Sequence, residues 1–124
     1  MRVFDTSFNV SVYLPLVMAY ARISVHEQIV ALGDPTRRAI VERLLKGPLP
    51  VGKIASEFPI SRPAISQHLR VLKRARLVVD RPIGNRRVYE LDPDGVDALR
   101  HYFEQFWTHA LAAFKRAAEK DEKR

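Results

Sequence analysis

Cysteine is absent from the 124-residue sequence, and this absence excludes several kinds of site at once. Disulfide bonds, thiolate zinc sites, iron–sulfur clusters and cysteine nucleophiles all require a thiol. A chain without thiols is compatible with a reducing compartment, and we expect a cytoplasmic protein.

Long apolar runs are also missing, because no stretch approaches the ~20 residues that a membrane-spanning helix needs. The segment from Val10 to Ile23 is apolar and contains Ala19-Tyr20-Ala21, which imitates a signal-peptide cleavage site, although Pro15 interrupts it. We therefore treat residues 1–23 as an N-terminal extension. It is a secretion signal, an arm buried against a dimer, or a segment upstream of a folded part that begins near Met18.

Sequence signatures of common enzymes are missing as well. The 5 glycines are isolated, so no glycine-rich loop can cradle a phosphate, and neither G-x-S-x-G nor H-E-x-x-H occurs. We interpret the scattered histidines as surface or packing residues rather than general bases. They are His26, His68, His101 and His109. The sequence predicts no enzyme, no cofactor and no metal.

Positive charge is what the sequence has in excess. The chain carries 21 Lys and Arg against 14 Asp and Glu, which gives a formal charge of +7. Such a balance is expected of proteins that contact polyanions, so nucleic acid is the first partner to consider. The length allows one compact domain, which we place at residues 24–122.

Apolar spacing and capping residues predict two helices at the start of this domain. Val25, Ile29 and Leu32 recur at helical spacing between Ser24 and Gly33. Asp34 is suited to cap a second helix that begins at Pro35 and ends before Gly47.

Two short helices separated by a tight turn follow. The first runs from Val51 to about Glu57, and the turn is Phe58-Pro59-Ile60. Ser61 is suited to cap the second, which buries Ile65, Leu69 and Leu72 and extends to about Arg74. This arrangement is typical of a helix-turn-helix.

A hairpin and a long helix complete the predicted fold. Residues 78–91 favour two strands around a Gly84-Asn85 turn, and Pro82 must lie at a sheet edge. The last helix begins near Asp94 and keeps an apolar stripe for about five turns, with residues 115–124 charged and frayed. The fold class is mainly α with a small β-hairpin, in the order α-α-α-α-β-β-α, a winged helix-turn-helix.

The stripe on the last helix carries more aromatic surface than so small a domain covers alone. Either a second copy covers it, which makes a homodimer, or the helix folds back onto its own core.

The charge is concentrated on the second helix of the motif and on the hairpin. Between Ser61 and Arg87 there are eight cations and one acid, Asp80, while the other 13 cations and 13 acids cancel. A solvated helix face does not explain so one-sided a distribution. The eight cations are Arg62, Arg70, Lys73, Arg74, Arg76, Arg81, Arg86 and Arg87.

An α-helix fits the major groove of duplex DNA, so we assign roles by position on the second helix. Side chains on its first turns are placed to read bases: Arg62, Pro63, Ser66 and Gln67. Others along the helix are placed for backbone contacts: Ser61, His68, Arg70, Lys73 and Arg74. The wing tip, Asn85, Arg86 and Arg87, reaches the flanking backbone or the minor groove.

Three segments together resemble the ArsR family of winged-helix repressors. They are A-L-G-D-P-T-R-R at 31–38, S-R-P-A-I-S-Q-H-L at 61–69 and G-N-R-R-V-Y-E-L at 84–91. The resemblance implies a homodimer, built from the first and last helices, that binds a palindromic operator and represses transcription. The implied dimer residues are Val25, Ile29, Leu99, Phe103, Phe106, Trp107, Ala110 and Phe114.

Two alternatives remain open. Members of this family that sense zinc carry paired ligands in the last helix, and here only His101-x2-Glu104 matches, with Asp97 on the same face. A metal-responsive repressor is therefore one alternative, and a winged helix used only for protein contact is the other. An unknown effector or partner protein is compatible with either reading.

Overall fold

The structure is a computed structural model that describes residues 23–122, and it begins with two capped helices. The Ser24 hydroxyl accepts a hydrogen bond from the backbone N–H of Glu27 at the start of α2 (Val25–Leu32). The Asp34 carboxylate accepts one from the N–H of Arg37 at the start of α3 (Pro35–Leu44). Both helices begin where the sequence predicts. The roles considered for residues 1–22 concern a segment outside the described residues.

The helix-turn-helix is formed by α4 (Val51–Ser56) and α5 (Arg62–Arg74), as predicted. The Ser61 hydroxyl caps α5 by accepting from the N–H of Ala64 at 3.3 Å. Three apolar side chains of α5 are buried: Ile65, Leu69 and Leu72. They fix which face of α5 turns inward and therefore which residues stay in solvent.

The sheet has three antiparallel strands where the sequence predicted only a hairpin. Strands β2 (Val78–Ile83) and β3 (Arg86–Leu91) form the expected hairpin, and the two-residue β1 (Leu49–Pro50) pairs with the other edge of β3. So short a strand has no alternation that a sequence pattern can reveal. Gly84 has a φ of +63°, which fits a tight hairpin turn, and Pro82 lies on the edge strand β2.

One apolar core joins the helices to the base of the hairpin. Its buried members are Ala31, Ile40, Leu44, Ile54, Ile65, Leu69, Leu72, Ala75, Leu77 and Val78. The hairpin extends from this core beside α5 as a wing.

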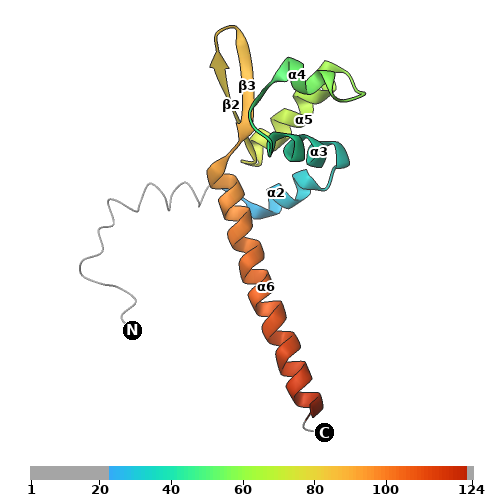
Figure 1. Cartoon of the computed structure of the whole chain (residues 1–124), viewed down its shortest axis with the longest axis vertical. Helices are drawn as coiled ribbons and strands as arrows, with labels where there is room; N and C mark the ends of the chain where they lie inside the picture. Colours follow the sequence, from blue (N-terminus) through green and yellow to red (C-terminus); the bar gives the residue numbers. More distant parts are fainter. Residues whose placement is uncertain (1–22, 123–124) are drawn as a thin grey trace, which may run out of the picture.

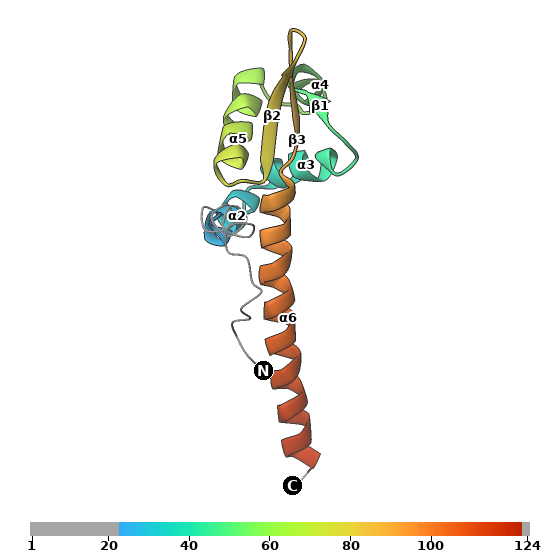
Figure 2. The ribbon, with the colours of Figure 1, turned by 90° about the vertical axis from the view of Figure 1, so that its left-hand side faces the viewer.

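Helix α6 (Pro93–Glu122) leaves the domain as a single straight helix (Figures 1 and 2). The carboxylate of Asp92 caps it by accepting from the N–H groups of Asp94 and Gly95 at 3.1 and 3.3 Å. The expectation that the helix frays from Lys115 is wrong, because α6 continues to Glu122. Alanine, lysine and glutamate dominate this part, and all three are strong helix formers.

Candidate nucleic-acid interface

The exposed face of α5 is set by its buried stripe. Because an α-helix has 3.6 residues per turn, Pro63, Gln67, Arg70 and Arg74 lie opposite the buried Ile65-Leu69-Leu72 stripe, and all four are exposed. Arg62 is exposed at the N-terminus, and Ser66 is half-buried. The base-reading candidates therefore all belong to the solvent-facing surface of the helix or its margin.

One flank of α5 faces α3 instead of open solvent. His68 is half-buried, with its Nδ1 3.5 Å from the Arg37 guanidinium and 3.9 Å from the Asp34 carboxylate. Arg37 also donates from Nε to the carbonyl oxygen of Ala31 at 2.7 Å. This placement separates His68 from the other predicted backbone contacts.

The other flank of α5 faces the wing across a concavity of about 520 Å³. Four cationic side chains and no acidic one line it, and the N-terminus of α4 forms its floor. The lining residues are Pro50, Val51, Gly52, Lys53, Ser56, Arg62, Asn85, Arg86 and Arg87.

The concavity joins Arg62 to the wing residues Asn85, Arg86 and Arg87, which the sequence predicted separately. It also adds Lys53 and Ser56, which sequence reasoning missed. The spacing of apolar residues in α4 shows which side chains are buried, but it cannot show that the exposed ones face a hairpin 30 residues later. The one sequence signal for these two residues was their spacing, since the Lys53 cation is followed three residues later by the Ser56 hydroxyl.

Four of the eight cations between Ser61 and Arg87 form ion pairs within the described residues. Lys73 and Arg87 both pair with Asp80. Arg76 pairs with Asp92, and Arg81 with Glu90. The cations of this segment for which residues 23–122 hold no ion-pair partner are Arg62, Arg70, Arg74 and Arg86. The excess positive charge of this segment is therefore partly neutralised by ion pairs. The cations without an ion-pair partner in the described part of the chain lie on α5 and at the wing tip.

The comparisons with known proteins agree with this geometry. The model of "Bacterial regulatory protein, arsR family" matches residues 34–79. Over 84 residues, the chain is 64% identical to the HTH-type transcriptional regulator Rv2034 of Mycobacterium tuberculosis, covering 68% of this chain and 78% of that protein. This chain belongs to the ArsR family.

Further comparisons support the assignment. The transcriptional repressor SdpR of Bacillus subtilis is 44% identical over 62 residues, 50% of this chain and 69% of that one. The solved structure of an ArsR-like regulator from Rhodococcus sp. RHA1 aligns with a TM-score of 0.64 and 28% identity, over 80% of this chain and 94% of that one. As an ArsR-family member, the chain is a winged helix-turn-helix DNA-binding transcriptional regulator and not an enzyme.

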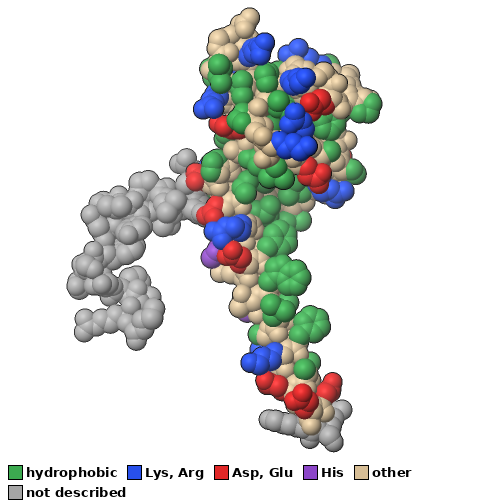
Figure 3. Space-filling model, in the orientation of Figure 1, with side chains coloured by type: hydrophobic (Ala, Val, Ile, Leu, Met, Phe, Trp, Pro, Cys, Tyr) green, Lys and Arg blue, Asp and Glu red, His purple; other side chains and the backbone are tan. Residues whose placement is uncertain are grey.

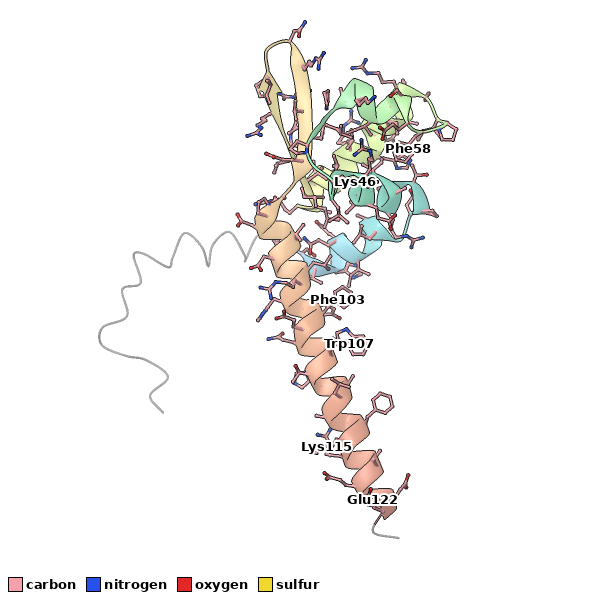
Figure 4. All side chains as sticks on the ribbon, viewed as in Figure 1. Lys46, Phe58, Phe103, Trp107, Lys115 and Glu122 are labelled. Atoms are coloured by element: carbon pink, nitrogen blue, oxygen red, sulfur yellow. The ribbon has the colours of Figure 1, made fainter. Side chains whose placement is uncertain are left out.

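The apolar stripe of this ArsR-family chain lies along α6 and is uncovered. Figure 3 shows hydrophobic side chains following one side of the helix, and Figure 4 shows Phe103 and Trp107 projecting from that side. Phe106 is 55% exposed and Phe114 74% exposed, so the alternative that the helix folds back onto its own core is wrong.

The remaining residues named for a dimer divide into two groups. Leu99 and Val25 are half-buried, Leu99 against the core, and Ala110 is also half-buried. Ile29 is exposed on α2, like its neighbour Val30. Leu111, whose spacing also placed it on the stripe, is exposed as well. Sequence reasoning missed two further exposed apolar side chains, Val30 on α2 and Tyr102 on α6.

The two acidic members of the possible zinc site on α6, Asp97 and Glu104, are engaged with a cation. Arg100 lies between Asp97 and Glu104 and binds both carboxylates, through Nη2 and Nε to Asp97 and through Nη1 to Glu104. Within residues 23–122, no group of three histidine or acidic side chains is placed to hold a metal ion.

None of the described helices combines the length and the apolar composition that crossing a membrane requires.

Proposed function

We propose that this regulator binds a palindromic operator in duplex DNA as a homodimer and represses transcription. The observation that carries the proposal is the position of α5, whose exposed N-terminal half lies beside a cation-lined concavity that ends at the wing. A helix presented in this way fits the major groove while the wing follows the flanking backbone.

The role of each residue follows from its place on α5 and the wing. Arg62 and Gln67 have the chemistry to read guanine and adenine, Ser66 to contact a base or a phosphate, and Pro63 to touch a thymine methyl. Exposed Arg70 and Arg74 serve the backbone, together with Lys53 and with Asn85 and Arg86 at the wing tip. Ser61 lies at the N-terminus of α5, where an anion is bound favourably, and its hydroxyl proton can be donated to a phosphate.

The homodimer is supported by the exposed stripe on α6 and by Ile29 and Val30 beside it on α2. An apolar surface of this extent on a small domain marks an interface, and symmetric pairs are the commonest small oligomers. Two copies then present two α5 helices to successive major grooves, about 34–36 Å apart. Repression is supported by the names of two relatives, the repressor SdpR and the arsenical resistance operon repressor of Staphylococcus xylosus.

Selection of bound sequences from a random duplex pool tests the whole proposal. We expect a palindrome whose half-sites are separated by about one helical turn, and a complex with two chains per duplex by sedimentation. Binding should weaken steeply with salt, with a log–log slope near 0.9 for each phosphate neutralised. A pool that shows no enrichment, with a response that is flat in salt, would instead favour a protein-contact module.

A further inference from the structure

The one acidic residue among the DNA-facing cations is buried between two of them. Asp80 has a side chain only 5% exposed. Its Oδ1 lies 2.7 Å from Nζ of Lys73, and its Oδ2 lies 2.8 Å from Nε of Arg87. Each carboxylate oxygen therefore binds a different cation.

These two cations come from different elements of the interface. Asp80 pairs across the sheet with Tyr89 and Pro82 pairs with Arg87, so Asp80 and Arg87 are diagonal neighbours on one face of the hairpin. Lys73 belongs to the last turn of α5. One carboxylate thus links the recognition helix to the wing.

The carboxylate stays ionised at neutral pH. The Lys73 hydrogen bond, with the nearby charges of Lys73 and Arg87, holds the pKa of Asp80 below its usual value despite burial. Both cations remain about half exposed, so they would reach phosphates if they were released.

This arrangement is unfavourable for simple attraction to DNA. A negative charge in a phosphate-binding surface repels the duplex and occupies two cations that would each release counterions. For DNA binding, it brings a gain only if a fixed angle between the two elements matters more than the lost attraction, because α5 and the wing must contact one duplex at the same time.

We propose that Asp80 is a specificity-determining positioning residue that fixes the angle between α5 and the wing and withholds Lys73 and Arg87 from non-specific contact with the DNA backbone. The inference rests on the proposed function, because it concerns how the same surface discriminates between duplexes. On this proposal, Asp80 lowers the affinity of the protein for any duplex and raises its preference for the operator.

The full chain with Asp80→Asn tests this, and Glu90→Gln is the matched control. Asparagine keeps the shape of the side chain and removes its charge. Glu90 is a carboxylate on the same hairpin, 3.6 Å from Arg81, and it pairs with Val79, so it lies on the other face of the hairpin from Asp80. Both variants gain one unit of net charge, so electrostatics alone treats them alike. Fluorescence anisotropy on the selected operator and on a scrambled duplex of equal length, over a salt series, gives affinities and slopes.

We expect Asp80→Asn to bind the scrambled duplex more tightly, with a salt slope steeper by about 0.9 for each released cation that reaches a phosphate. We expect its preference for the operator to fall by about tenfold. Glu90→Gln should bind both duplexes slightly more tightly and keep the preference. A variant that is merely less stable would not gain a steeper slope.

A second variant, Lys73→Gln, breaks the link to α5 while leaving Asp80 and Arg87 paired. It lowers the net charge by one and releases no cation, so scrambled-duplex binding should weaken slightly, but the operator preference should still fall. An operator preference that both variants retain would overturn the role of Asp80 while leaving the proposed function intact. A wild-type chain that does not distinguish the two duplexes would overturn both.

Discussion

A β-carbon on Gly95 would lie 1.4 Å from the carbonyl oxygen of Arg76, so the start of α6 is packed directly against the turn that ends α5. Arg76 itself has a left-handed φ of +63°, and its guanidinium pairs with Asp92, which caps α6. The Gly95 carbonyl accepts a hydrogen bond from the buried amide of Gln28 in α2 at 2.8 Å. The direction of α6 is therefore fixed at this junction of three elements.

Gly95→Ala should destabilise the protein, because the added methyl meets backbone that cannot rotate away. We expect a loss of about 1–3 kcal/mol or more in the free energy of unfolding, measured by urea denaturation at a fixed chain concentration. Gly52→Ala is the control, since a β-carbon there meets nothing within 4 Å. Alanine in place of that exposed helical glycine should be neutral or stabilising by up to about 1 kcal/mol. Equal stability of Gly95→Ala and the wild type would show that the backbone at Arg76 can shift to accommodate the methyl group at little cost in free energy.

The proposed dimer through the exposed stripe of α6 predicts that an added charge disrupts it at one position and not at the neighbouring one. Phe106→Glu places a carboxylate in the stripe, and we expect sedimentation equilibrium to report monomers for this variant and dimers for the wild type. Gln105→Glu adds the same charge on the opposite side of the same helix, and it should leave the dimer unchanged. Monomers in both variants, or dimers in both, would separate dimerisation from this stripe.

Arg62 and Arg86 line the same concavity but should affect binding differently. A base-reading arginine specifies sequence, so Arg62→Ala should cost about 1–3 kcal/mol on the selected operator and relax the preference at one base position. Arg86→Ala at the wing tip should weaken binding to all duplexes and lower the salt slope. Equal losses on all sequences for Arg62→Ala would assign it to the backbone instead.

Lys53 tests whether the floor of the concavity belongs to the interface. Lys53→Ala should reduce affinity for operator and scrambled duplex alike and lower the salt slope by about 0.9, the value for one phosphate. Lys46→Ala removes the same charge just after α3, outside the lining of the concavity, and should change the slope less. Equal slopes for the two variants would remove α4 from the interface.

The sequence predicts most of the fold because caps and periodicity are local signals. Ser24, Asp34 and Ser61 each cap the helix that follows, and the α5 stripe is buried as its spacing indicates. Strand β1 could not be predicted, since its two residues are held only by β3, nearly 40 residues later.

The candidate site divides in the same way. Its residues on α5 and the wing follow from a motif and a turn, whereas Lys53 depends on contacts distant in sequence. The pairing of Asp80 with Lys73 and Arg87 was equally out of reach, because charge counting treats a neutralised cation and an exposed one alike. Sequence reasoning thus predicted which elements form the candidate interface, but not the ion pairs within it.

The buried carboxylate also predicts how stability depends on pH. Because the folded-state pKa of Asp80 is lowered, mainly by the Lys73 hydrogen bond, its contribution is fully present above the unfolded-state value near 3.8. It is lost as pH falls through the lower folded-state pKa, where the carboxylate binds a proton in both states. The thermal midpoint of the wild type should therefore exceed that of Asp80→Asn by a constant amount above about pH 5, and the two should converge in stronger acid. Glu90→Gln, which alters a more exposed pair, should show a smaller difference at neutral pH. Curves for wild type and Asp80→Asn that stay parallel down to pH 3 would mean that the ionised form of Asp80 adds nothing to the stability of the helix–wing contact.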